Sequence, residues 1–305
     1  MLMISPVVNT VYTHSDSFHV DELAAISLLA RYWFNQPVCE LNIIRTRDND
    51  ILEKAKAGPD FVIDVGREYD KDKLNFDHHQ VDENLVWEDG TLFSSCGLIV
   101  HWLNEHSESF KNEDTLIKHR IFEFAKCVDK TDNGIEYWKE SVFFLSYNHS
   151  YDEDDQWRQF ARALQAMEGY IDNMIFKEKE RLRARMIMPF MEHESIKNGH
   201  PQVLILEEPI SGTEARFYAI DTKAKWIATR FEKEWVIKSV PNDKMNLMSS
   251  KCNMPKAWCG LENEELQKVS GFNLRFCHKG GFICVLVDSK AKVIELTEKM
   301  LELSK

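Results

Sequence analysis

The chain has 305 residues, of which 44% are hydrophobic and 29% charged, and its formal net charge is −12. This length and composition can build one large core or two smaller ones, and they exclude a disordered or fibrous protein. The acidic balance argues against tight non-specific binding to nucleic acid through bulk electrostatics. Bound cations and a local basic surface could still attract phosphate groups.

The cysteines and the N-terminus indicate the compartment. Seven cysteines form no CxxC pair, and an odd number does not suit a secreted disulfide framework. For the C-x6-C spacings of the C-terminal half we favour buried free thiols over a zinc site. No apolar run reaches the ~18 residues of a membrane span, and the N-terminus resembles neither a signal nor a transit peptide. We therefore expect a cytoplasmic protein without a membrane partner.

The N-terminal half alternates short apolar runs with helical patterns, which predicts a parallel α/β sheet. We expect strands at Val7–Thr13, Leu41–Thr46 and Phe61–Val65. Helices are expected from Asp21, before Gly58, over Ser94–His106 and over Glu113–Val128. Ligands of an open parallel sheet bind beyond the carboxyl ends of its strands, and His14, Asp64 and Asp77 fall at or near such ends.

From Asp152 the apolar residues follow the spacing of one long helix, and their stripe predicts packing rather than a cofactor site. Its segment Lys177–Arg185 carries five basic and two acidic residues, which fits a solvated helix face or a surface that tracks phosphates. Beyond Asn198–Pro201 we expect strands at Val203–Leu206, Ala215–Ile220, Trp235–Val240 and Phe282–Val287, followed by a terminal helix. This order predicts a smaller α+β domain.

The residues that carry chemistry fall into four clusters of the same predicted α/β unit. The clusters are Thr13–Glu22, Asp64, Asn75–Gln80 and Cys127–Gly134. A lone buried aspartate is more often a hydrogen-bond anchor, and a lone pair of histidines is often a surface feature. Four such clusters together favour a metal site, and nitrogen and oxygen ligands of this kind suit Mn²⁺, Zn²⁺ or Fe.

The order of these clusters resembles a known superfamily. The pattern H-x4-H-x-D, then Asp in a strand, then Asp-His-His, then Asp, is similar to the four motifs of the DHH phosphoesterase superfamily. The strings THSDSFHVDELA, RTRD, DVG, FDHHQ, TDNGI and FCHKGGFI resemble the MYG1 family (UPF0160), whose members are described as 3′-5′ RNA exonucleases. The resemblance covers almost the whole chain. It implies a DHH-like catalytic domain over residues 1–151, a connecting helix over 152–198 and a substrate-binding domain over 199–305.

The resemblance also implies roles for individual residues. Two divalent cations would activate water, with Mn²⁺ expected first and Mg²⁺, Zn²⁺ or Fe²⁺ as alternatives. Their ligands would be His14, His19, Asp21, Asp64, His78 and Asp129, with Asp132 as the rival of Asp129. His79 would contact the phosphoryl group, and Asp77 would orient a neighbouring histidine. In the C-terminal domain the residues similar to the family's glycine-rich substrate loop are Arg275, His278, Lys279, Gly280 and Gly281.

The chain departs from the family pattern at a few positions. Asp16 stands where glycine is usual, and Asn148–Tyr151 and Cys284–Val285 also differ. These changes leave the implied metal centre intact and bear on the substrate instead.

We therefore expect a metal-dependent 3′-5′ exonuclease whose substrate is single-stranded RNA or a related short phosphodiester. A second hypothesis is a small-molecule phosphoesterase that acts on dinucleotides, pyrophosphate or a sugar phosphate, which the acidic net charge mildly favours. A third is a non-catalytic binding protein in which the metals only stabilise the fold. A peptide hydrolase is a weaker fourth. The sequence leaves the oligomeric state open.

Overall fold

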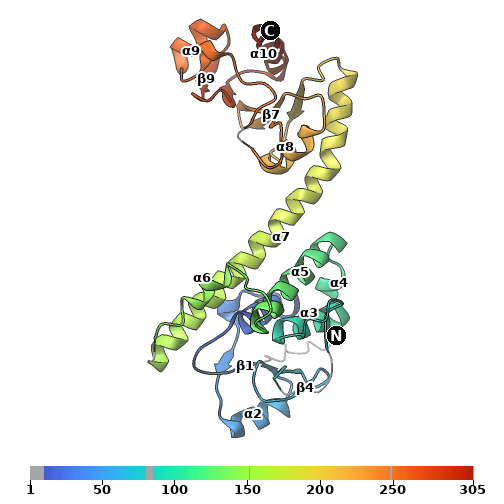
Figure 1. Cartoon of the computed structure of the whole chain (residues 1–305), viewed down its shortest axis with the longest axis vertical. Coiled ribbons are helices and arrows are strands. Elements are labelled where there is room, and N and C mark those ends of the chain that lie inside the picture. The colour runs from blue at the N-terminus through green and yellow to red at the C-terminus, as the bar shows by residue number, and fades with distance from the viewer. Residues whose placement is uncertain (1–9, 80–84, 151, 248, 305) are drawn as a thin grey trace, which may run out of the picture. The chain divides into compact units, whose positions relative to one another are not determined.

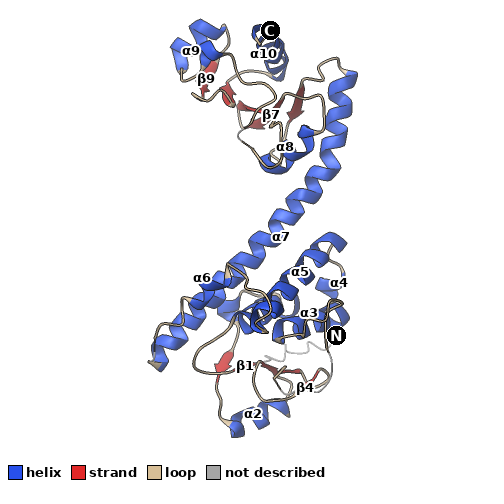
Figure 2. Ribbon diagram, in the orientation of Figure 1, coloured by secondary structure: helices blue, strands red, loops and turns tan. Residues whose placement is uncertain are grey.

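The computed structural model describes residues 10–79, 85–150, 152–247 and 249–304. The chain divides between Glu178 and Lys179 into two compact units, which share the long helix α7 (Glu153–Lys197) (Figure 1). Each unit is a mixed α/β structure with its own five-stranded sheet (Figure 2). Among the described residues no helix is both long and apolar enough to cross a membrane. The three predicted domain ranges stay predictions.

The sheet of the N-terminal unit confirms the predicted parallel α/β class. Its strand order is β2-β1-β3-β5-β4. The strands are β1 (Val11–Thr13), β2 (Ile43–Arg45), β3 (Phe61–Ile63), β4 (Tyr69–Asp70) and β5 (Asn75–Phe76). Only β4 runs antiparallel to its neighbour. The sequence did not predict β4 and β5, because two residues are too few to show a strand period. Residues 7–9 of the first predicted strand, as well as Gln80 and Tyr151, lie outside the described residues.

The register of the three central strands sets up the site. Val11 of β1 pairs with Phe61 of β3, and Ile63 of β3 pairs with Phe76 of β5. Because the strands are parallel and in step, the residues that follow them meet at one edge of the sheet. Those residues are His14, Asp64 and Asp77.

Helices cover both faces of this sheet. On one face α2 (Asn49–Lys56) buries Leu52 and Ala55 against Val62. On the other face Phe61 packs edge-on against Trp102 of α3 (Ser95–His106). The remaining helices of the unit are α1 (Val20–Leu29), its π-helical continuation Ala30–Phe34, the 3-10 helix Val38–Glu40, α4 (Glu108–Lys111), α5 (Thr115–Asp132) and α6 (Ser141–Leu145). The start of α1, the start of α3 and the end of α5 each bring side chains to the site described below.

The C-terminal unit has a mixed sheet with the order β6-β7-β8-β10-β9. Its strands are β6 (Val203–Leu206), β7 (Trp226–Phe231), β8 (Glu234–Ser239), β9 (Leu274–Cys277) and β10 (Ile283–Leu286). Its helices are α8 (Gly212–Ile220), the 3-10 helix Lys256–Trp258, α9 (Asn263–Ser270) and α10 (Lys290–Leu303). Alternate residues of β6 enter different cores: Val203 and Ile205 face α9 and α10, and Leu204 and Leu206 face α7 and α8. The sheet of this predicted α+β domain has three antiparallel strand pairs and one parallel pair, β6 with β7.

The predicted strand Ala215–Ile220 is wrong, because this segment forms α8. Its apolar residues are too few to distinguish a strand from one buried turn of helix. Ala215 and Ala219 are four residues apart and both buried, which places them on one helical face against Ala184 and Met188 of α7. Tertiary packing therefore decides the structure of this segment.

Candidate metal centre

The N-terminal unit gathers polar side chains at the edge where β1, β3 and β5 end. His14, Asp64 and His78 follow these strands within one or two residues. His19 and Asp21 come from the start of α1. Each polar side chain is thus held by the end of a regular element, which fixes its position.

Asp64 is at the centre of this cluster. One of its oxygens, Oδ2, lies 3.2 Å from Nε2 of His14 and 3.8 Å from Nδ1 of His19. The other oxygen, Oδ1, lies 3.4 Å from Nε2 of His78. The Asp64 side chain is 1% exposed, and its backbone has a left-handed φ of 56°. Such strain in a buried carboxylate is typical of functional sites.

Three groups of ligand atoms in the cluster are compact enough to hold a metal ion. Within each group the atoms lie within 4.8 Å of one another. The groups are His14, His19, Glu22 and Asp64; Asp64, His78 and His79; and His19, Asp21 and Asp132. Asp64 and His19 each belong to two groups. Of the two, only the carboxylate of Asp64 has two ligand oxygens, so Asp64 would serve both of two neighbouring cations.

The hydrogen bonding of these residues fits a divalent cation. Buried polar atoms are normally hydrogen-bonded, but Nε2 of His14, Oδ2 of Asp64 and Nε2 of His78 form no hydrogen bond among the described residues, although they approach neighbouring carboxylates or ring nitrogens at 3.0 to 3.4 Å. Nδ1 of His14 lies 2.9 Å from the carbonyl oxygen of Ser15, which can only accept. Nδ1 also lies 3.1 Å from Nη2 of Arg47, which can only donate, while Nε2 faces the carboxylates of Glu22 and Asp64 at 3.0 and 3.2 Å. A cation among these three side chains would take the lone pair of Nε2. Imidazole and carboxylate ligands suit Mn²⁺, Zn²⁺ or Fe²⁺.

The cluster perturbs the acidities of its members strongly. Burial lowers the pKa of His14, but the carboxylates of Asp64 and Glu22 outweigh it and raise this pKa to about 10. Burial raises the pKa of Asp64, but His14, His19 and His78 outweigh it and hold this pKa well below its usual value. Opposite shifts among buried neighbours are typical of a functional site.

The two rival aspartates of α5 have different surroundings. Oδ2 of Asp132 lies 3.3 Å from Nε2 of His78, and Asp132 belongs to one of the three groups. Asp129 accepts hydrogen bonds from Trp87 Nε1 (2.6 Å), Ser94 Oγ (2.5 Å) and the backbone N–H of Gly97 (3.0 Å). Burial raises the pKa of Asp129 to about 7 despite these donors. The structure thus brings Asp132, and not Asp129, together with the other candidate ligands.

Asp77 is the first residue of the Asp77-His78-His79 triplet, and its side chain is hydrogen-bonded to His79. Its Oδ1 accepts from both the backbone N–H (3.0 Å) and Nδ1 (2.9 Å) of His79. Its Oδ2 accepts from the backbone N–H of Arg67 (2.7 Å). Both oxygens are engaged, so Asp77 is placed to orient its neighbours. The His79 side chain is 53% exposed and lines a pocket of about 760 Å³ beside the cluster.

Glu22 is a candidate ligand that the sequence-based set omits. It is fully buried, and its Oε1 lies 3.0 Å from Nε2 of His14. Its Oε2 accepts from the backbone N–H of His19 (2.8 Å), which is the bond of a helix capping box. A glutamate at this helical position is adequately explained by capping, so its second contact can be seen only in three dimensions.

Replacing Glu22 with glutamine is expected to weaken Mn²⁺ binding at least about 10-fold. The amide oxygen can still accept from His19, so α1 keeps its cap, whereas the negative charge beside His14 is lost. Isothermal titration calorimetry of Mn²⁺ binding measures the effect. Glu123→Gln, on the exposed face of α5, is the matched control. Equal affinities for both variants would remove Glu22 from the ligand set.

The five predicted substrate residues belong to the C-terminal unit. Arg275 donates to Glu234 at 2.7 Å. The backbone N–H of Gly280 donates to Nδ1 of His278 (3.0 Å), and that of Gly281 to the carbonyl oxygen of His278 (2.8 Å). In this conformation both N–H groups are used within the turn. Contact of this turn, including Lys279, with substrate stays a prediction.

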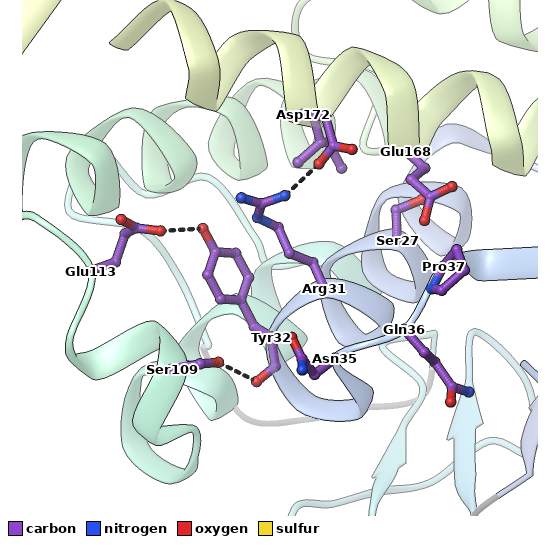
Figure 3. A pocket seen from close by; sticks show the side chains of 11 residues that line it. Ser27, Arg31, Tyr32, Asn35, Gln36, Pro37, Ser109, Glu113, Glu168 and Asp172 are labelled. Carbon is purple, nitrogen blue, oxygen red and sulfur yellow. Dashed lines mark hydrogen bonds and ion pairs between the residues drawn. The ribbon is translucent and has the colours of Figure 1, made fainter. Parts of the chain in front are cut away.

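A second pocket lies at the far end of α1, beside its π-helical continuation (Figure 3). Arg31 forms an ion pair with Asp172 of α7, and the Tyr32 hydroxyl donates to Glu113 at 3.1 Å (Figure 3). The Ser109 hydroxyl donates to the carbonyl oxygen of Tyr32 at 2.6 Å. This pocket shares no lining residue with the one beside Asp64, so it is separate from the candidate metal centre.

The matches among solved structures are weak and include two structures of RecJ. RecJ from Thermus thermophilus in complex with Mn²⁺ is 11% identical with a TM-score of 0.28; the match covers 97% of this chain, which spans 52% of that one. Exonuclease RecJ bound to manganese is 10% identical with a TM-score of 0.29, over 96% of this chain and 89% of that one. TM-scores of this size do not establish a shared fold, so the resemblance to the DHH superfamily depends on the sequence motifs.

Comparison with curated proteins and family models gives matches over nearly the whole chain. The MYG1 protein of Chlamydia pneumoniae is 29% identical over 286 residues, which cover 90% of this chain and 91% of that protein. The MYG1 exonuclease of Homo sapiens is 28% identical over 318 residues, which cover 89% of this chain and 80% of that protein. The family model MYG1_exonuc, described as uncharacterised protein family (UPF0160), matches residues 10–301. The chain therefore belongs to the MYG1 family.

Proposed function

We propose that this chain is a divalent-metal-dependent phosphodiesterase that removes nucleotides from the 3′ end of single-stranded RNA. The observation that carries the proposal is the buried cluster around Asp64, whose nitrogen and oxygen ligand atoms, several without a hydrogen bond to the described residues, adjoin a pocket of about 760 Å³. Membership of a family whose relatives include proteins named MYG1 exonuclease supports a nuclease among the possible hydrolases.

The cluster has ligands for two cations, with Mn²⁺ as the first candidate. His14, His19, Glu22 and Asp64 would hold one, and Asp64, His78, Asp21 and Asp132 the other. When bound, such ions lower the pKa of water and neutralise charge on a phosphoryl group.

His79 and Asp77 supply the proton chemistry. The Asp77 carboxylate raises the pKa of His79 and fixes its ring through the bond to Nδ1. A protonated His79 at the pocket then stabilises the charge that develops on the phosphoryl oxygens or on the leaving group. Asp77 keeps the ring in position and carries no metal.

A small-molecule phosphoesterase is the second candidate. The net charge of −12 disfavours long nucleic acid, and the volume of the pocket suits a ligand of nucleotide size. A small-molecule phosphoesterase would use the same cluster as the exonuclease. The two would differ only in the protein residues that contact the substrate beyond the cleaved phosphate.

A substrate panel separates the two candidates. The full chain with Mn²⁺ is given 5′-labelled single-stranded RNA, the same sequence as DNA, a dinucleotide, pyrophosphate and a sugar phosphate. The proposal predicts stepwise shortening of RNA from its 3′ end, abolished by EDTA and by His78→Ala. Turnover of the small compounds alone would establish the second candidate. Stabilisation by Mn²⁺ without turnover of any substrate would establish a non-catalytic, metal-stabilised protein.

A further inference from the structure

In the described part of the chain, three cationic side chains line the pocket beside the candidate metal cluster, and two of them have partners. Nζ of Lys56 lies 2.6 Å from Glu53 and 3.3 Å from Glu68. Nε of Arg47 lies 3.3 Å from Oδ2 of Asp16. These two cations are therefore largely neutralised within the fold, and the third, Arg67, differs from both.

Arg67 is exposed, and its guanidinium has no hydrogen bond or ion pair with the described part of the chain. Its backbone has a left-handed φ of 56°. A residue with a long side chain rarely adopts this backbone conformation, which glycine adopts without strain. Nothing in the packing of the described residues requires an arginine here, so its side chain is a candidate for contact with a ligand.

The backbone of Arg67 is tied to the catalytic triplet. Its N–H donates to Oδ2 of Asp77 at 2.7 Å, and Oδ1 of the same carboxylate holds Nδ1 of His79 at 2.9 Å. The Asp77 carboxylate thus fixes two groups: the His79 ring, which is proposed to contact the cleaved phosphate, and the backbone of Arg67. The planar guanidinium matches phosphate oxygens through two parallel hydrogen bonds.

The two arginines of the pocket lie at different points. Nη2 of Arg47 is 3.1 Å from Nδ1 of His14, so Arg47 stands directly beside a candidate metal ligand. Arg67 belongs to the loop that follows β3 and lines the pocket without a hydrogen bond or ion pair between its side chain and the described candidate ligands. Arg47 is therefore close to the phosphate that would be cleaved, and the Arg67 guanidinium, which no described residue binds, can bind another group.

We propose that Arg67 binds a second phosphate of the substrate, next to the one that is cleaved. This inference builds on the proposed function and makes it more specific: the enzyme prefers substrates with at least two phosphates over compounds with a single phosphodiester. In a chain of net charge −12, a guanidinium at the pocket that is unpaired among the described residues also offsets the electrostatic repulsion of such a substrate.

The test compares Arg67→Gly with wild type on three dinucleotides. ApA has only the phosphate to be cleaved, whereas pApA and ApAp carry a second phosphate at the 5′ or 3′ end. For one of the latter two, KM is expected to rise at least about 10-fold in the variant, while KM for ApA changes less than about 3-fold. Glycine suits the left-handed backbone, so the unfolding midpoint is expected to stay equal or rise. Arg67→Lys keeps the positive charge but loses the two parallel N–H donors of the guanidinium. Its KM for the substrate with the second phosphate is expected to lie between those of wild type and Arg67→Gly.

Equilibrium binding of fluorescently labelled ApA, pApA and ApAp provides a readout that needs no turnover. Glu232→Gly is the matched control, because Glu232 also has a left-handed φ, of 53°, and belongs to the C-terminal unit. It is expected to alter neither binding nor KM. Equal effects of Arg67→Gly on all three dinucleotides, or no effect on any, would overturn the inference and leave the proposed function standing. Arg67-dependent binding of the second phosphate without hydrolysis would support the inference and overturn the proposed function.

Discussion

Replacing Asp64 with asparagine is expected to lower metal-dependent turnover at least about 10³-fold and to weaken Mn²⁺ binding strongly. Asp64 supplies a carboxylate to two of the three ligand groups and approaches four histidines. Asparagine has nearly the same shape and tolerates the left-handed φ of 56°, so the change removes the charge and keeps the backbone. The loss would therefore report on metal chemistry rather than on folding.

Two measurements separate these causes. In wild type, Mn²⁺ at 100 times its Kd is expected to add about 2.7 kcal/mol to the free energy of unfolding, whereas Asp64→Asn gains much less at the same concentration. The second measurement is turnover of RNA at saturating Mn²⁺. Asp72→Asn is the control, since Asp72 is exposed between β4 and β5. Full Mn²⁺-dependent stabilisation and turnover in Asp64→Asn would contradict the assignment of the cluster.

Replacing Gly97 with alanine is expected to destabilise the N-terminal unit by at least about 3 kcal/mol. A Cβ at Gly97 would lie 2.1 Å from Oδ2 of Asp129, a distance that atoms do not tolerate. The carboxylate has little freedom to move, because Trp87, Ser94 and Gly97 itself hold its two oxygens. Displacing it would leave a buried carboxylate without its donors, and α3 and α5 would move apart.

The prediction is specific because Gly97→Ala is expected to destabilise the protein, whereas this change usually stabilises a helix. Glycine to alanine inside a helix ordinarily stabilises by about 0.5–1 kcal/mol. Gly169 of α7 is the matched control, because a Cβ there would meet nothing within 4 Å. Chemical denaturation of both variants measures the two free energies. A stabilised Gly97→Ala would show that Asp129 does not pack against α3 as described.

Much of the N-terminal fold could be predicted because its signals are local. The strand over Phe61–Ile63 is a run of apolar residues, and the helix over Ser95–His106 begins after a serine cap. The parallel sheet then follows from the alternation of strands and helices. The segment Ala215–Ile220 could not be predicted, because its few apolar residues fit either structure and contacts with α7 decide between them.

Some residues of the candidate site could also be predicted from the sequence, and others could not. His14, Asp64 and His78 could be located from the sequence because strand ends and motif order mark them. The choice between Asp129 and Asp132 could not, since both lie at the end of one helix and only the donors Trp87 and Ser94 distinguish them. The left-handed backbones of Asp64 and Arg67 also depend on three-dimensional contacts and leave no signal in the sequence.

Anomalous diffraction from crystals of the full chain loaded with Mn²⁺ tests the central claim, that the side chains around Asp64 form the metal centre. We predict manganese peaks among the ligand atoms of His14, Glu22 and Asp64 and among those of Asp64, His78 and Asp132. We predict no peak bound by Asp129, whose oxygens are hydrogen-bonded. Manganese bound elsewhere, or no manganese at Asp64 in a preparation that cleaves RNA, would contradict the account.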